Sequence, residues 1–262
     1  MSIKNKIVFI TGASSGIGEA CAHLFASQGA RLILCARNQD KLTILKTNLT
    51  KNYRADVYVL PLDVANHDTV KTGITSLPAD WQAVDILINS AGLALGLETI
   101  QRGNPTDWDR MIDTNVKGLL YVTHYVLKGM ITRNKGHIIT LGSISSHAVY
   151  PTGVVYCATK YAVKAISEGL KMDVHGTPIR ITEIDPGSVE TEFSNTRFKG
   201  NKTLAAMVYE GYTPLSAGDV ADAILYAVLC PAHVNIRQIL LTPTDQTNIH
   251  MINRKNTDSS SQ

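Results

Sequence analysis

A tyrosine and a lysine are spaced so that they could move a proton. Tyr156 is the only one of the ten tyrosines with a lysine four residues later, at Lys160. On a helix the two side chains share one face, although by spacing alone such a pair can also be a surface contact. Free tyrosine has a pKa near 10, and one cation about 4 Å away at an effective dielectric near 20 could lower it by about three units. Ser143, thirteen residues before Tyr156, follows a strand-like segment and could hydrogen-bond a substrate oxygen. The three residues predict general acid–base chemistry at an alcohol or carbonyl oxygen.

A glycine-rich turn near the start of the chain predicts a phosphate site. Residues 11–18 read Thr-Gly-Ala-Ser-Ser-Gly-Ile-Gly and separate a strand pattern (6–11) from a helical pattern (16–28). Glycines let a pyrophosphate approach the backbone, and a helix N-terminus offers unpaired N–H groups. The alternative is a turn that packing alone requires. We expect a dinucleotide to contact Gly12, Ser14, Ser15, Gly16, Ile17 and Gly18.

The end of the second predicted strand indicates which dinucleotide binds. An NAD enzyme needs a carboxylate there for the ribose 2′-hydroxyl, but the chain has Ala36 followed by Arg37 and Asn38. A guanidinium can pair with a 2′-phosphate, so we predict NADP, with Arg37 and Asn38 as ligands. The alternative is that Arg37 is a solvated surface cation.

Seven strand-like segments must position these residues. They span residues 6–11, 30–36, 55–64, 84–92, 136–143, 178–187 and 237–243, with helical patterns between them, including a long one from 108 to 132. Nearly continuous apolar strands separated by helices indicate a parallel sheet buried on both faces. The sequence therefore predicts one α/β doubly wound, Rossmann-type domain with a seven-stranded parallel sheet. We expect residues 1–245 to form the dinucleotide-binding catalytic domain and 246–262 a polar, partly disordered C-terminal tail.

Composition excludes several other classes. The chain has 262 residues and a formal net charge of +3, which gives no general attraction to nucleic acid or to a membrane. No apolar run approaches a membrane span, and the strand pattern begins too early for a signal peptide. The four cysteines include no CxxC motif and the histidines are far apart, so we expect reduced thiols in the cytoplasm and no metal site.

Together these motifs resemble the short-chain dehydrogenase/reductase family across nearly the whole chain. The resemblance adds Asp63-Val64, the run Asn89-Ser90-Ala91-Gly92, Asn115 in the long helix, and Pro186-Gly187 after the sixth strand. Ser90 stands where the family usually shows a second asparagine. The resemblance implies contacts with the cofactor for Asp63, Val64, Asn89, Ser90, Ala91, Gly92, Pro186, Gly187, Val189 and Thr191. Asn115 has a different implied role. Asn115 is expected to hold a water that links Lys160 to solvent, which completes a catalytic set with Ser143, Tyr156 and Lys160.

A closer resemblance is carried by residues 76–81, 89–96, 107–119, 190–200 and 231–236. These segments resemble the branch that uses NADP to oxidise serine, allo-threonine and related 3-hydroxy acids. This resemblance implies an oxidoreductase, and commonly a homotetramer, with the helices 108–132 and 151–174 at one interface. Two alternatives remain at this point. One is an NADPH-dependent carbonyl reductase for uncharged ketones or aldehydes, and the other is a non-catalytic NADP-binding sensor or scaffold.

The segment 187–200 is expected to cover the substrate. It contains two cations, Arg197 and Lys199, beside Phe193 and Phe198. A 3-hydroxy acid needs a cation for its carboxylate, and the planar guanidinium can bind both oxygens. We therefore expect Arg197 to bind the substrate carboxylate when the lid closes. Lys199 is the less specific alternative. A further alternative is that both cations are solvated charges on a mobile lid.

Overall fold

A seven-stranded parallel sheet forms the centre of the molecule. The computed structural model describes residues 2–255. The strands follow the spatial order β3-β2-β1-β4-β5-β6-β7 and all pair in parallel, which confirms the predicted doubly wound fold. Their bounds are β1 Ile7–Thr11, β2 Arg31–Ala36, β3 Val57–Pro61, β4 Ile86–Asn89, β5 His137–Leu141, β6 Arg180–Pro186 and β7 Gln238–Leu241.

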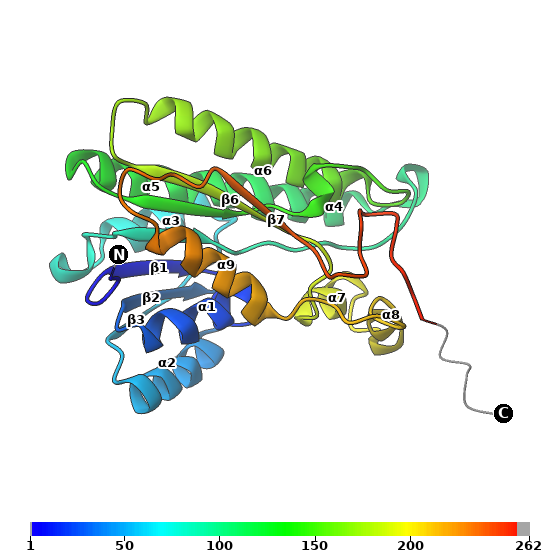
Figure 1. Cartoon of the computed structure of the whole chain (residues 1–262), viewed down its shortest axis with the longest axis horizontal. Helices are drawn as coiled ribbons and strands as arrows, with labels where there is room; N and C mark the ends of the chain where they lie inside the picture. The colour runs from blue at the N-terminus through cyan, green and yellow to red at the C-terminus, as the bar shows by residue number, and fades with distance from the viewer. Residues whose placement is uncertain (1, 256–262) are drawn as a thin grey trace.

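Helices cover both faces of the sheet (Figure 1). Helices α1 (Gly16–Ser27), α2 (Gln39–Tyr53) and α9 (Ala217–Leu229) bury apolar side chains against one face, where Phe25, Leu42 and Ile224 are completely buried. On the other face lie α3 (His67–Thr75), α5 (Leu119–Thr132) and α6 (Val154–Asp173), with Val126 and Met130 in that core. Because both faces are covered, most strand residues are apolar, which is the pattern that the sequence shows. None of the described helices is long and apolar enough to cross a membrane.

The long helix expected from 108 to 132 is interrupted. The structure has α4 (Pro105–Ile112), then a π-helical segment (Asp113–Gly118), then α5. Asn115 lies in the π-helical segment, and its amide both donates to and accepts from Leu93 at 2.8 Å. The hydrogen bonds between Asn115 and Leu93 therefore lie at a π-helical bulge. Such bulges occur frequently at functional sites.

Two short helices and the C-terminal segment close one end of the molecule (Figure 1). They are α7 (Glu192–Arg197) and α8 (Lys202–Met207), which follow β6. Residues 246–255 of the expected tail pack back onto this region, since Gln246 is buried and Arg254 donates to the carbonyl oxygen of Val208 at 3.0 Å. The expectation of disorder for residues 256–262 lies outside the described residues.

Candidate active site

A cavity of about 740 Å³ opens at the carboxyl edge of the sheet. Parallel strands bring the residues that follow β1, β2, β4, β5 and β6 to this edge, where ligands of doubly wound folds bind. The predicted residues that line the cavity are Gly12, Ser14, Ser15, Gly16, Ile17, Arg37, Asn38, Asp63, Val64, Ser90, Ala91, Gly92, Ser143, Tyr156, Lys160, Pro186, Gly187, Val189 and Thr191. Four predicted residues lie outside the lining, namely Gly18, Asn89, Asn115 and Arg197.

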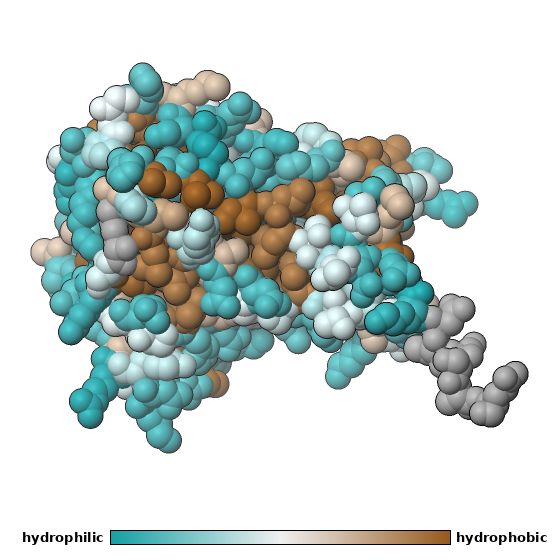
Figure 2. Space-filling view, in the orientation of Figure 1, coloured by the Kyte–Doolittle hydropathy of each residue, from teal (hydrophilic) through white to brown (hydrophobic). Residues whose placement is uncertain are grey.

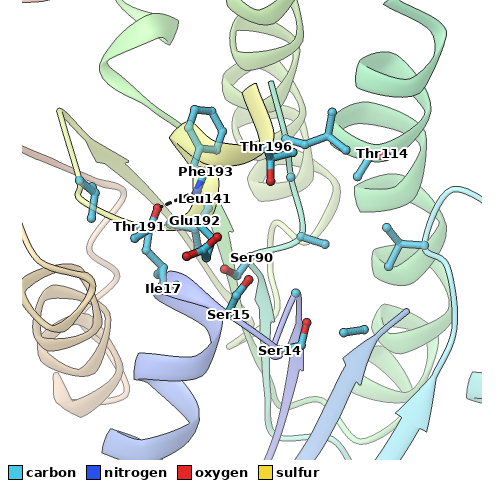
Figure 3. A pocket seen from close by; sticks show the side chains of 18 of the residues that line it. Ser14, Ser15, Ile17, Ser90, Thr114, Leu141, Thr191, Glu192, Phe193 and Thr196 are labelled. Atoms are coloured by element: carbon cyan, nitrogen blue, oxygen red, sulfur yellow. Dashed lines mark hydrogen bonds between the residues drawn. The ribbon is translucent and has the colours of Figure 1, made fainter. Parts of the chain in front are cut away.

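The glycines of the first turn are required by close backbone packing. Gly12 has φ +67°, and a Cβ there would lie 2.9 Å from the backbone of Ala91. A Cβ on Gly18 would lie 2.3 Å from the carbonyl oxygen of Gly12, so Gly18 shapes the turn without facing the cavity. Gly16 also has a positive φ, and the nearest atoms to a Cβ there belong to Thr191, 3.3 Å away. Figure 3 shows Ser14 and Ser15 at this turn and Thr191 on a neighbouring wall of the pocket.

Two cations lie at the end of β2. Arg37 and Asn38 line the cavity as predicted, and Lys41 from the first turn of α2 joins them. The Asn38 side chain caps α2 by accepting from the Lys41 amide at 2.9 Å, so its carbonyl oxygen is already engaged. Lys41 was not predicted from the sequence, although its position one turn after Arg37 places it beside the same corner.

The segment after β4 separates into a buried and an exposed part. The Asn89 amide donates to Thr123 at 3.0 Å beneath the cavity. The next three residues, Ser90 to Gly92, form the wall itself, and the Ala91 amide donates to the Thr11 hydroxyl at 3.1 Å. Asn89 therefore supports the wall through its hydrogen bond to Thr123 and does not line the cavity.

Three of the four predicted catalytic residues meet at the inner end of the cavity. Tyr156 and Lys160 lie one turn apart on α6, and the Lys160 Nζ is 5.8 Å from the Tyr156 ring centroid. The Lys160 ammonium donates to the carbonyl oxygen of Leu141 at 2.8 Å. Ser143 follows β5, and its hydroxyl accepts from the Ser145 amide at 3.1 Å. All three side chains are at least nine-tenths buried.

Asn115 stands directly behind this group. A Cβ on Gly92 would lie 3.4 Å from the Asn115 Oδ1 and 3.8 Å from the Lys160 Nζ, so the two polar groups flank the same glycine. The Asn115 amide also donates to the Thr159 hydroxyl at 3.0 Å. Asn115 thus connects the loop after β4, the π-helical segment and α6.

Burial dominates the proton affinities in this group. It raises the pKa of Tyr156, while the Ser143 hydroxyl and the Arg197 charge oppose the rise. Burial also lowers the pKa of Lys160 to about 8. The pKa of Tyr156 therefore shifts in the direction opposite to the one expected from a neighbouring lysine, because the desolvation of a buried phenolate outweighs the Ser143 hydrogen bond and the Arg197 charge.

The lid residues Arg197 and Lys199 have different environments. The Arg197 guanidinium donates to the Tyr150 hydroxyl at 2.5 Å, and its Cζ lies 5.6 Å from the Tyr156 ring centroid. Phe193 packs edge-on against the same ring at 5.6 Å. Lys199 instead forms an ion pair with Asp107 at 2.7 Å. Of the two cations, Arg197 is therefore the one that adjoins Tyr156, although it does not line the cavity.

The fold and this pocket are those of a Rossmann-type oxidoreductase. The chain belongs to the short-chain dehydrogenase family, whose sequence profile, described as "short chain dehydrogenase", matches residues 6–202.

The chain is similar to several members of this family. It is 44% identical over 249 residues to the NADP-dependent 3-hydroxy acid dehydrogenase YdfG of Escherichia coli (strain K12), covering 93% of this chain and 99% of that protein. It is 42% identical over 241 residues to sulfoacetaldehyde reductase 2 of Chromohalobacter salexigens, covering 92% and 95% of the two chains. Among solved structures, the closed form of a serine dehydrogenase complexed with NADP⁺ superposes with a TM-score of 0.90 at 43% identity, over 95% of this chain and 100% of that one.

Proposed function

We propose that the chain is an NADP-dependent dehydrogenase that oxidises small 3-hydroxy acids such as serine, allo-threonine or 3-hydroxyisobutyrate. The observation that carries the proposal is the placement of a guanidinium, that of Arg197, 5.6 Å from the ring of Tyr156. A buried tyrosine beside a cation suits a substrate that carries an anion close to its reacting hydroxyl. The names of the relatives described above agree with this substrate class.

The cavity fits a dinucleotide. At Gly12 and Gly16 the β1–α1 turn presents bare backbone to the cavity, and α1 begins there without a side-chain cap on its first N–H groups. At the other end, Ala36 leaves room where an NAD enzyme carries a carboxylate, and Arg37 and Lys41 supply positive charge. This corner supports NADP, because a 2′-phosphate can bind both cations.

The catalytic residues have separable roles in the proposed reaction. When bound, NADP⁺ would supply the hydride acceptor. Ser143 binds the substrate hydroxyl, Tyr156 takes its proton, and Lys160 stabilises the resulting phenolate. Asn115 fixes the loop after β4 and, by resemblance, holds the water through which Lys160 exchanges protons with solvent. In the reductive direction Tyr156 donates the proton.

Arg197 is proposed to bind the substrate carboxylate. Tyr150 holds one terminal nitrogen of the guanidinium, and the Gly96 carbonyl oxygen accepts from its Nε at 3.4 Å. These bonds orient the planar fork, and the remaining N–H groups can donate to a substrate carboxylate once the lid closes over the substrate. A sulfonate one carbon from the reacting carbon presents its charge at a similar distance, which is the chemistry that the name of the sulfoacetaldehyde reductase describes.

A substrate panel tests the function. NADPH formation is followed with serine, 3-hydroxyisobutyrate, a 2-hydroxy sulfonate and an uncharged secondary alcohol of similar size. We expect kcat/KM to be highest for the hydroxy acids. A preference for the uncharged alcohol would favour the carbonyl-reductase alternative, and no turnover of any substrate would favour an NADP-binding sensor or scaffold.

A homotetramer in the cytoplasm belongs to the same proposal. Exposed apolar side chains lie on α5 and α6, among them Leu120 (42% exposed), Tyr161 (41%) and Met172 (67%). Figure 2 shows a second apolar region across the face on which β7 and α9 lie, where Leu240 is exposed. Two apolar faces on one chain suit an assembly with two kinds of interface. Sedimentation of the purified protein at micromolar concentration tests this, and a monomer would contradict it.

A further inference from the structure

Two acidic side chains are buried beneath the catalytic lysine. Glu183 and Asp185 alternate with apolar residues on β6 and are 4% and 0% exposed. Both carboxylates converge on Gly142, because a Cβ there would lie 1.8 Å from the Asp185 Oδ1 and 2.7 Å from the Glu183 Oε1. Side chains larger than that of glycine are therefore excluded at position 142, directly between the Lys160 acceptor Leu141 and the catalytic Ser143.

Asp185 is held by three hydrogen-bond donors. Its Oδ1 accepts the backbone N–H of Ser143 at 3.1 Å. Its Oδ2 accepts from the Gln238 amide at 2.6 Å and from the His147 Nε2 at 2.8 Å. Asp185 therefore ties the Ser143 backbone to β7 and to the loop that contains His147.

Glu183 has the opposite environment. Its Oε1 is buried without a hydrogen-bond partner in the described part of the chain. Burial and the neighbouring Asp185 charge raise the pKa of Glu183 to about 8, which favours its protonated form. Two carboxyl groups this close in a dry site share one negative charge.

The pair faces two lysines of α6. Lys160 and Lys164 both interact electrostatically with Glu183, and Lys164 also approaches the His147 Nδ1 at 3.5 Å. The pKa of Lys160 depends on two opposing effects. Burial lowers it, and the charges of Asp185 and Glu183 raise it. Lys160 makes its hydrogen bond to a neutral carbonyl, so the acidic pair is its nearby source of negative charge.

We propose that Glu183 and Asp185 form a buried carboxyl pair with one shared negative charge, which positions Ser143 through its backbone and keeps Lys160 protonated for catalysis. Neither carboxyl group touches the reacting atoms, so both are positioning residues. Because the charge belongs to the pair, removing one carboxyl group leaves the other to carry it. Removing both leaves Lys160 without a counter-charge.

The kinetic test rests on the proposed hydroxy acid oxidation. Glu183→Gln, Asp185→Asn and the double variant are compared with Glu168→Gln, which changes an exposed glutamate of α6. We expect the alkaline limb of the kcat/KM profile to move by less than about half a pH unit in each single variant. In the double variant it should move to lower pH by about one unit or more, because Lys160 then loses its proton more readily. Additive shifts, or a loss that is equal at every pH, would overturn the shared charge.

A stability measurement tests the pair without any assay of activity. A glutamate whose pKa is raised to about 8 in the folded protein binds a proton that the unfolded chain releases above about pH 4.5. Its contribution to stability therefore falls as pH rises from about 5 to 8. The Tm of Glu183→Gln minus that of the parent should increase over this range, while the difference for Glu168→Gln stays flat. A flat difference for Glu183→Gln would show an ionised glutamate and reject the pair even if the enzyme is active.

Discussion

Removal of the Arg37 side chain should weaken NADPH binding and leave NADH binding almost unchanged. Arg37 and Lys41 both line the cavity at the end of β2, and both are exposed. A charge-assisted hydrogen bond contributes about 1.5–3 kcal/mol, and the lower value suits an exposed corner. Arg37→Ala should therefore raise the Kd for NADPH about 10-fold, and Arg37→Ala/Lys41→Ala about 100-fold. The Kd for NADH should change less than 2-fold, because NADH has no 2′-phosphate.

Titration of cofactor fluorescence measures both constants. Lys46→Ala is the matched control, because Lys46 is an exposed lysine of α2 that does not line the cavity. The salt dependence adds a second readout, since the loss should shrink as ionic strength rises. The assignment of this corner to a 2′-phosphate fails if NADPH and NADH lose affinity equally.

Three further predictions concern catalysis and stability. Tyr156→Phe should lower kcat at least about 100-fold, because it removes the proposed acid–base group. Tyr161→Phe, on the exposed side of α6, should leave kcat equal to that of the parent. Equal kcat values for the two variants would remove Tyr156 from the mechanism. Gly18→Ala should lower the free energy of unfolding in urea titrations by about 1–3 kcal/mol, because the new Cβ would lie 2.3 Å from the Gly12 carbonyl oxygen. The control Gly169→Ala should cost nothing, because a Cβ at that position has no neighbour within 4 Å. Equal stabilities of the two variants would refute the close packing at Gly18. Burial lowers the pKa of His137 to about 3 in the folded protein, whereas the unfolded chain binds a proton there below about pH 6.5, so stability is lost on acidification. His137→Gln should therefore reduce the fall of Tm between pH 6.5 and 4. An unchanged slope of Tm against pH would contradict a neutral His137.

The strands and the glycine turn were predictable because their causes are local. Nearly continuous apolar runs such as residues 7–11 can be buried only between two helical layers, and glycines in a strand–turn–helix context point to close backbone approach. The Tyr156–Lys160 spacing likewise follows from one helix. The structure brings these residues to one cavity because parallel strands share a carboxyl edge.

Other features depended on contacts that spacing does not reveal. The π-helical interruption at Asn115 follows from its bonds to Leu93, 22 residues away. The separate environments of Arg197 and Lys199 follow from Tyr150 and Asp107, which lie far away in the sequence. Glu183 and Asp185 did leave a signal, since two acids inside a strand that must be buried require an explanation. Their convergence on Gly142 needed the pairing of β5 with β6.

The most direct test of the proposed function compares Arg197→Met with Lys199→Met. Initial rates of NADPH formation are measured for each variant with a 3-hydroxy acid and with an uncharged secondary alcohol. Arg197 adjoins Tyr156, whereas Lys199 is paired with Asp107. Arg197→Met should therefore raise KM for the hydroxy acid at least about 10-fold and leave kcat/KM for the alcohol within about 3-fold of the parent, while Lys199→Met behaves like the parent with both substrates. Equal losses for both substrates in Arg197→Met, or a larger effect of Lys199→Met on the hydroxy acid, would contradict a carboxylate anchor beside the catalytic tyrosine.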